Sequence, residues 1–346
     1  AYEIRNCDWS SDVCSSDLVA ATMGTAVIAD ISIKGNAKYE YFNTQMTSGA
    51  DTNTANTEVN LLVAGKTGDT SVVANFELNS HGAGSSDTMD IEDLYMKTKV
   101  GDVAVKGGNW ALGTTALLGE IDEGGRSNNK VDLSTTIAGV KVYAGSSSAA
   151  AGTSTTEVKS AMYAGVVADV SGWTLQAKKL NANDYAYGIS GEIEGFGIRF
   201  ENKNKKAANS DVNFGQITKT VGDFDLAVAY IDADASGLVT ESDSSIFAVE
   251  MSTATAGTAD TGVDSVAQIS AKTSIAGNTV TVKAGTVGAS AGYKDADFTQ
   301  ISASRSLAAG STLALTYTDK DDRSVVTSAA DADKQVFEID RSEERR

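Results

Sequence analysis

Three carboxylates and one guanidinium lie close together in a glycine-rich stretch about a third of the way along the chain. Residues 109–129 (NWALGTTALLGEIDEGGRSNN) contain Glu120, Asp122, Glu123 and Arg126 and show no hydrophobic period. A stretch of this length without a period, inside a compact fold, is usually a functional loop or a disordered segment. Such carboxylates, facing cations across a narrow gap, set up a field that orders polar solutes and tunes ion preference.

The cations that would face this acidic stretch precede it in the chain. Lys97, Lys99 and Lys106 alternate with apolar residues on both sides of Gly101-Asp102. Alternation with period two places successive side chains on opposite faces of a strand. A two-residue connection then predicts a hairpin with one apolar face and one basic face.

Patterns for catalysis and for metal binding are weaker than this charge arrangement. Residues 288–292 (GASAG) fit the G-x-S-x-G nucleophile pattern, but no strand–turn–helix context surrounds them, and the single histidine, His81, is distant in sequence. Acidic pairs such as Asp319/Asp321 lack the spacing of a 12-residue calcium loop and are expected on solvated loop faces. The sequence therefore predicts no enzyme activity, no catalytic residue, no cofactor and no metal site.

Charge and hydropathy restrict the class further. The chain has 346 residues, a net charge of -18 and no proline. Such acidity disfavours nucleic acid as a partner, because phosphates require a basic surface. No apolar run approaches the roughly 18 residues of a membrane helix, whereas a transmembrane β-barrel needs only about 10 alternating residues per strand.

Strand patterns recur along the whole chain. Residues 30–43 alternate cleanly, and similar segments follow, separated in turn by short turns and by longer polar connections. This asymmetry predicts an all-β, up-and-down antiparallel transmembrane barrel of 16–18 strands, and the count favours 18. The apolar run at residues 246–251, within a long connection, fits either a loop helix or a strand.

Aromatic residues are expected in two belts at the ends of the apolar face. Trp173, Phe196 and Phe224 directly follow short turns, and tyrosines such as Tyr185 and Tyr230 lie near the long connections. Aromatic belts flank the apolar band of membrane barrels. The alternative is the general preference of aromatic residues for strands.

Both ends of the chain look foreign to the fold. Residues 7–18 and 341–346 resemble translated sequencing adapters, so residues 1–18 and 341–346 are interpreted as artefacts, which removes both cysteines from consideration. Residues 19–29 read as the remnant of a signal peptide; the alternative is a buried strand or helix. The barrel is then assigned to residues 30–340, with its last strand truncated.

Across residues 30–340 the chain resembles the Gram-negative porins. The resemblance rests on the signal-peptide remnant, the alternating strands, the two unequal rims and the long loop between the fifth and sixth strands. Gly119-Glu120 and Gly124-Gly125 match the family's constriction sequence only loosely, and its terminal aromatic residue is absent. The resemblance implies an outer-membrane homotrimer, in contact with lipid and lipopolysaccharide, that passes ions and small hydrophilic solutes.

Under this reading, Glu120, Asp122, Glu123 and Arg126 belong to a constriction loop at residues 109–129, and a basic inner wall faces them. The leading wall residues are Lys34, Lys38, Lys97, Lys99, Lys106 and Arg199, and the same alternation adds Lys178, Lys203 and Lys219. The simpler reading leaves the acids on an exposed loop and the lysines as solubilising groups. The alternative function is a secreted surface-array or adhesin-like structural β-protein, with shorter strands around a single core.

Overall fold

In the computed structural model, almost all described residues lie in β-strands or in the tight turns between them. The structure describes residues 30–46, 52–81, 88–111, 126–147, 161–180, 184–205, 210–233, 246–248, 263–289, 295–307, 311–320 and 334–345. No helix long and apolar enough to cross a membrane occurs among these residues.

The strands are long, as the alternating patterns predicted. They are β1 (Asp30–Met46), β2 (Thr52–Thr67), β3 (Thr70–His81), β4 (Thr88–Val100), β5 (Val103–Ala111), β6 (Arg126–Ile137), β7 (Val140–Ser147), β8 (Ala161–Val170), β9 (Trp173–Leu180), β10 (Asp184–Ile193), β11 (Phe196–Lys205), β12 (Ser210–Val221), β13 (Phe224–Ala233), β14 (Val263–Ile275), β15 (Asn278–Ala289), β16 (Ala296–Ser306), β17 (Ser311–Lys320) and β18 (Lys334–Arg345).

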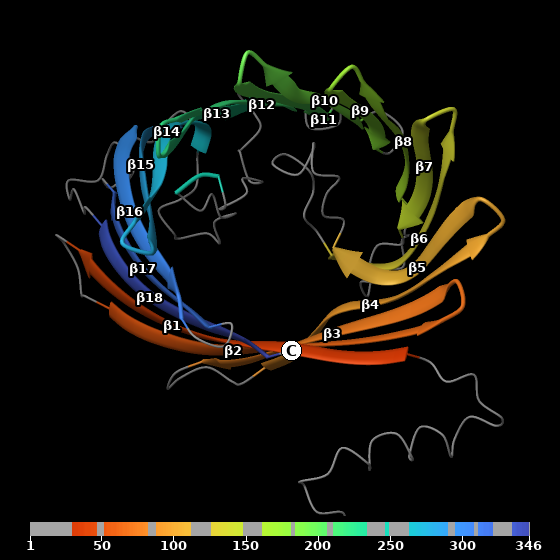
Figure 1. Ribbon diagram of the computed structural model, residues 1–346, viewed down its shortest axis with the longest axis horizontal. Coiled ribbons are helices and arrows are strands. Elements are labelled where there is room, and N and C mark those ends of the chain that lie inside the picture. The colour runs from red at the N-terminus through yellow and green to blue at the C-terminus, as the bar shows by residue number, and fades with distance from the viewer. Residues whose placement is uncertain are drawn as a thin grey trace, which may run out of the picture.

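Strand pairing closes the sheet into a barrel. Each strand is antiparallel to the next in sequence, and β18 pairs with both β17 and β1, from Lys334 opposite Met46 to Arg345 opposite Gly35. Figure 1 shows the closed ring viewed down the barrel. The predicted all-β antiparallel barrel, with the favoured count of 18 strands, is therefore confirmed. A barrel of this size leaves an aqueous interior, because side chains alone cannot fill it.

Tight turns at one rim set the register of the hairpins. Ala138, Ser171, Glu194 and Ala276 have φ of 50–51°, and each precedes a glycine that also has positive φ. Two consecutive residues with positive φ form the type I′ turn, whose twist matches that of paired strands. All connections at the other rim include residues outside the described set. The predicted division into a rim of short turns and a rim of longer connections is confirmed.

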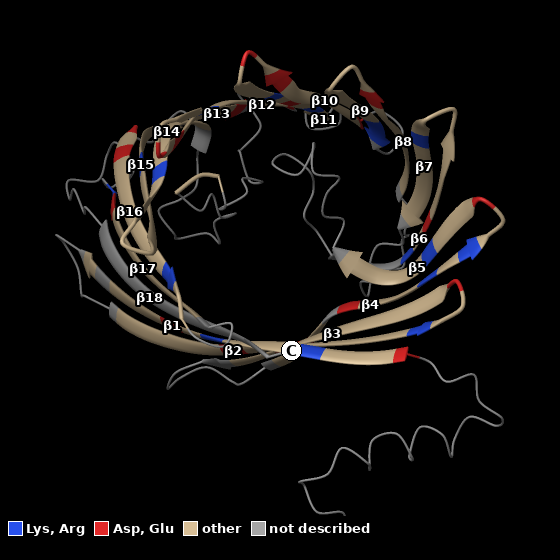
Figure 2. Ribbon diagram, viewed as in Figure 1, with Lys and Arg blue, Asp and Glu red and all other residues tan. Residues whose placement is uncertain are grey.

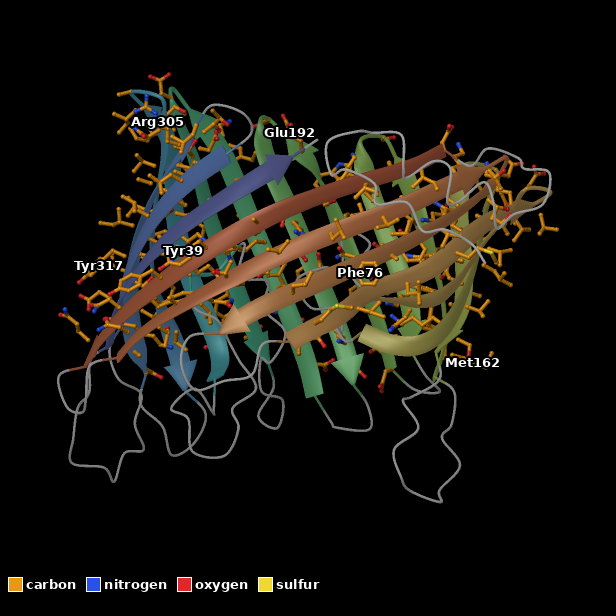
Figure 3. All side chains as sticks on the ribbon, turned by 90° about the horizontal axis from the view of Figure 1, so that it is seen from below. Tyr39, Phe76, Met162, Glu192, Arg305 and Tyr317 are labelled. Atoms are coloured by element: carbon orange, nitrogen blue, oxygen red, sulfur yellow. The ribbon has the colours of Figure 1, made fainter. Side chains whose placement is uncertain are left out.

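The outer surface is apolar. Large hydrophobic side chains such as Ile33, Val100 and Ile217 are more than half exposed. Figure 3 shows side chains projecting from the outer face, with Tyr39 and Tyr317 labelled. Tyr185 and Tyr187 stack with ring centroids 6.4 Å apart near the rim of long connections. An exposed apolar band bordered by aromatic rings matches the lipid-facing surface of a membrane barrel.

Three strand ends differ from the predicted boundaries. β18 continues through Arg345 rather than ending at residue 340, because ladder hydrogen bonds join backbone groups whatever the side chains are. The identification of residues 341–346 as an adapter remains a prediction, and residues 1–29 lie outside the described set. The predicted loop at residues 109–129 is also too long, since β5 extends to Ala111 and β6 begins at Arg126.

Candidate functional site: the inner wall of the barrel

The inner wall consists of the strand positions opposite the apolar band. Charged positions occur on strands all around the ring (Figure 2). Alternation and strand pairing place all six leading wall residues on this inner face: Lys34, Lys38, Lys97, Lys99, Lys106 and Arg199. Lys219 was wrongly assigned to this face: it is paired with the exposed Phe196 and points outward, with its ammonium 4.1 Å from the centre of that ring. The described inner wall divides into three sectors of different chemistry.

The first sector, on β1–β3, combines carboxylates with carboxamides. In this acid–amide sector, Asn56 donates to Glu40 at 3.4 Å, and Asn60 and Asn79 donate to Glu58 and Glu77. Lys38 also forms an ion pair with Glu40. Because carboxamides are neutral, they hold these three carboxylates in place on the wall without cancelling their charge.

The second sector, on β4–β11, combines cations with aromatic rings. On β4–β6 the Lys106 ammonium lies 3.8 Å from the ring centre of Tyr95 and 4.3 Å from that of Trp110. Lys130, which is 1% exposed, donates to the Trp110 backbone carbonyl. The two rings meet edge to face with centroids 6.1 Å apart. Cation–π contact holds these ammonium groups close to the wall.

The middle of this basic–aromatic sector is built from a reciprocal pair of tyrosines. On β7 and β8, Tyr143 is paired with Gly165 and Tyr163 with Gly145, and each ring occupies the space above the opposing glycine. Tyr163 donates to Asp132 at 3.0 Å. The lack of a side chain at the two glycines leaves each ring the space that it occupies against the opposing strand.

On β9–β11 the sector continues as buried polar groups. Gln176 donates to the Tyr143 hydroxyl at 3.3 Å, and the Lys178 ammonium lies 5.6 Å from the Tyr163 ring centre. Arg199 pairs with Glu201 at 2.6 Å, and the neighbouring Lys203 has no exposed surface. Bases therefore outnumber acids among the residues named for this sector. β10 and β11 lie across the ring from β2 and β3 (Figure 1), so the two charged sectors face each other.

The third sector, toward the long-connection ends of β12–β16, is apolar although it faces the lumen. Its buried residues are Val212, Phe214, Ala229, Ile231, Val266, Val287 and Phe298. They surround Phe247, which belongs to the connection between β13 and β14 and is 0% exposed. The rings of Phe247 and Phe214 meet edge to face, 6.1 Å apart. Burying one phenylalanine side chain stabilises this arrangement by about 2–3 kcal/mol.

Two glutamine side chains fix the backbone on either side of Phe247. The Gln268 carboxamide accepts from the Ala248 amide at 2.8 Å and donates to the Ile246 carbonyl at 2.6 Å. Gln300 donates to the Ala248 carbonyl at 3.4 Å. Residues 246–248 are thus held by both apolar packing and hydrogen bonds. They are neither helix nor strand, which corrects both readings of the 246–251 run over the residues described.

The predicted constriction-loop residues lie mostly outside the described set. Glu120, Asp122 and Glu123 fall in the undescribed residues 112–125. Arg126 is the first residue of β6, where its backbone pairs with Ala111. Their predicted role remains a prediction.

The apolar sector and its occupant were missed by sequence reasoning. A signal was present: near the long-connection ends of β12–β16, both faces carry apolar residues, as at Ile231 inside and Tyr230 outside. Such a strand must be covered on both sides. The apolar run beginning at Ile246 was the segment in the same region able to provide that cover.

Charged clusters give no sign of a metal centre in the described ranges, where no group of three or more His, Cys, Asp or Glu residues is arranged to hold an ion. The sector geometry instead suits electrostatic contact with solutes that move through water.

Comparisons with known proteins agree on the fold. No family model matches the chain, and the curated proteins contain no match. Solved structures do match: Pseudomonas aeruginosa OccK9 (OpdG) gives a TM-score of 0.64 at 13% identity, covering 91% of this chain and 99% of that one. Acinetobacter baumannii OccAB3 gives 0.63 at 10% identity, covering 91% and 100%. OccK2 (OpdF) of Pseudomonas aeruginosa, solved in complex with glucuronate, gives 0.60 at 13% identity, covering 91% and 99%.

These neighbours are outer-membrane porins, and the chain shares their 18-stranded barrel fold. At 10–13% identity the likeness establishes the fold alone.

Proposed function

We propose that this protein is an outer-membrane diffusion porin that passes ions and small hydrophilic solutes and catalyses no reaction. The observation that carries the proposal is that burial is the reverse of that in a water-soluble protein. Large apolar side chains are exposed on the outside, while charged side chains such as Lys130 and Glu201 are buried on the inner wall. This reversal is stable when lipid lies outside the barrel and water inside. The porin neighbours support the same function.

The experiment is solute passage into liposomes that contain the refolded protein. Osmotic swelling with sugars of increasing size should be fast for the smallest and fall steeply as the solute approaches the pore width. Protein-free liposomes and liposomes with heat-denatured protein are the controls. Equal, slow swelling for every sugar with folded protein would remove the proposal.

We further propose that Glu120, Asp122, Glu123 and Arg126 narrow the pore opposite the basic–aromatic sector. The support is the set of cations that line that sector, such as Lys106, Lys178 and Arg199, which acids entering the lumen would complement. Replacing the three acids by Gln, Asn and Gln should move the reversal potential in a salt gradient toward anions. The matched control removes three acids at the short-turn rim, with Asp69→Asn, Asp102→Asn and Asp223→Asn. Equal shifts in both triple variants would exclude a role specific to this loop.

The proposal includes a homotrimer in contact with outer-membrane lipid and lipopolysaccharide. Its expected signs are trimer mass after chemical crosslinking in mild detergent and migration that changes on heating. The alternative, a surface-array or adhesin-like protein, predicts release from cells by chelator without detergent. The strand lengths and the outward apolar faces weigh against it, since an array strand would direct its apolar face into a single core.

A further inference from the structure

Aromatic residues are distributed unevenly around the outer face of the barrel. Outward-facing rings occur on strands such as β9, β10, β13, β17 and β1, as at Trp173, Tyr187, Tyr230, Tyr317 and Tyr39. On the five strands of the β4–β8 arc, none of the described outward side chains is aromatic or charged. Aromatic rings anchor a barrel where lipid tails meet head groups, so this arc is not built like the rest of the lipid-facing wall.

The β4–β8 arc is covered by exposed aliphatic side chains. Met89, Val100, Ile137 and Met162 are 61–70% exposed. A large exposed apolar patch marks a surface that another molecule covers, and in a membrane that molecule is lipid or protein. Because the described part of the arc has no aromatic ring at either end, we favour protein as its cover.

The two edges of the arc differ in the size of their side chains. On β4 the outward positions carry Ile91, Leu94 and Met96, whereas on β7 and β8 they include Ala144 and Ala164. Within lipid, protein association depends on close packing, and small residues permit close approach. Bulky side chains at one edge and small ones at the other suit contact between two different patches of identical chains, which is the heterologous contact that closes into a ring.

The width of the arc agrees with threefold symmetry. Eighteen strands divide the ring into steps of about 20°. Each ring in a closed trimer touches its two neighbours at points about 60° apart, or about three strands, and the β4–β8 arc contains two such points. A second arc without described aromatic rings, β14–β16, carries outward Asp297 and Arg305 and lies across the ring (Figure 1). Surfaces on opposite sides of a ring cannot meet in one threefold interface, so β4–β8 is the arc that fits.

We propose that the outer face of β4–β8 is the interface between copies of this chain in a homotrimer, with β4 of one copy packed against β7 and β8 of the next. The location rests on the homotrimer included in the proposed function. It follows from the outer face alone and needs no assumption about what passes through the pore.

The first test is crosslinking between copies. In a chain carrying Cys7→Ser and Cys14→Ser, the pair Leu94→Cys and Val166→Cys places one thiol near the middle of β4 and one near the middle of β8. Within one barrel these strands are four steps apart, about 19 Å at the usual strand spacing. A bis-maleimide crosslinker shorter than this gap therefore joins the two thiols only between copies, and it should give a covalent trimer in mild detergent. The control pair, Leu94→Cys with Ile269→Cys on β14, should give none.

The second test disturbs the packing of the interface. Ala164→Trp enlarges the small edge of the arc, and the resulting overpacking should lower the trimeric fraction in mild detergent by about tenfold, measured as native mass by light scattering. Ala164→Ser keeps a small side chain there and should leave the trimeric fraction unaltered. Ala284→Trp, at an outward position on β15, is the matched control and should also leave it unaltered. Heat-modifiable migration of each variant confirms that the barrel has folded.

The outcomes separate the interface from the proposed function. Covalent trimer from the β4–β8 pair, together with loss of trimer in Ala164→Trp, supports the interface. Trimeric mass without that crosslink, or a trimeric fraction that Ala164→Trp leaves unaltered, overturns the interface and leaves the homotrimer intact. Monomeric mass of the folded wild-type protein overturns both the homotrimer and the interface. Covalent trimer from a folded protein that lets no sugar into liposomes overturns the porin function and leaves the interface intact.

Discussion

The basic–aromatic sector on β4–β11 and the apolar sector on β12–β16 use the same scaffold for opposite purposes. Both are inner faces of long antiparallel strands joined by tight turns. In the first, Lys106 and Lys178 lie against aromatic rings; in the second, Phe247 lies among aliphatic and aromatic side chains. An inner wall of this barrel therefore takes its chemistry from what covers it. The wall that faces water is lined by charged side chains, and the wall covered by residues 246–248 is lined by apolar side chains.

The largest effect is expected from a substitution that disturbs the backbone of the basic–aromatic sector. Gly108 on β5 has φ 134°, and a Cβ there would meet the Leu94 carbonyl oxygen and the Tyr95 backbone. Gly108→Ala should therefore lower the free energy of unfolding by about 3 kcal/mol. Urea unfolding in detergent, followed by heat-modifiable migration, measures the change. Gly215→Ala on β12, where a Cβ meets nothing within 4 Å, is the control; equal losses would contradict the role of close packing at Gly108.

The next prediction concerns charge rather than stability. Lys106→Gln with Lys178→Gln removes two cations from the lumen, so the anion-to-cation permeability ratio should fall by about twofold. The reversal potential of single channels in a salt gradient measures this ratio. The control, Lys179→Gln with Lys219→Gln, removes the same charge from the outer face and should leave the ratio unaltered. Equal shifts would show that position on the wall is irrelevant.

A smaller effect is expected from the tyrosine pair. Tyr163→Phe removes the hydrogen bond to Asp132 and should cost about 1 kcal/mol of unfolding free energy. Tyr187→Phe alters an outward, half-exposed tyrosine and is the control. Thermal unfolding in detergent gives both values. A loss in the control as large as in Tyr163→Phe would remove the stabilising role assigned to the Asp132 contact.

The prediction with the smallest effect tests whether the two sectors share the same strand and turn geometry. Ala138 and Ala276 occupy the first position of type I′ turns, one in each sector, with φ of 50° and 51°. Asparagine tolerates this conformation better than alanine, so Ala138→Asn and Ala276→Asn should each stabilise the barrel by about 0.5 kcal/mol. Thermal unfolding again provides the measurement. A gain at only one turn would mean that the sectors differ in scaffold as well as in lining.

Local rules were sufficient to predict the barrel. Period-two alternation, as in β1, and two-residue turns such as Gly101-Asp102 act within one hairpin, so they can be read without knowing distant contacts. The inner position of Lys106 and Arg199 followed from the same rule. The same rule places Lys219 on the outer face with Ile217; it was assigned to the lumen only because it is charged, and its ammonium lies 2.8 Å from the Glu194 carbonyl at the rim of short turns. Long aliphatic stems allow that geometry on an apolar face.

The packing of residues 246–248 against the inner wall could not be predicted in the same way. The Phe247 contacts join residues far apart in sequence, from Val212 to Phe298, and no period in the 246–251 run reveals its partner. The pairing of Tyr143 over Gly165 also depends on register between neighbouring strands. Such contacts follow from closure of the whole ring rather than from any single strand.

The most direct test of a charged, water-filled lumen is single-channel recording of the refolded wild-type protein in a planar bilayer. We expect stable, ohmic current steps whose size rises in proportion to salt concentration, since ions cross in water. Folded, heat-modifiable protein that inserts into the bilayer and yields no steps would contradict a charged, water-filled lumen.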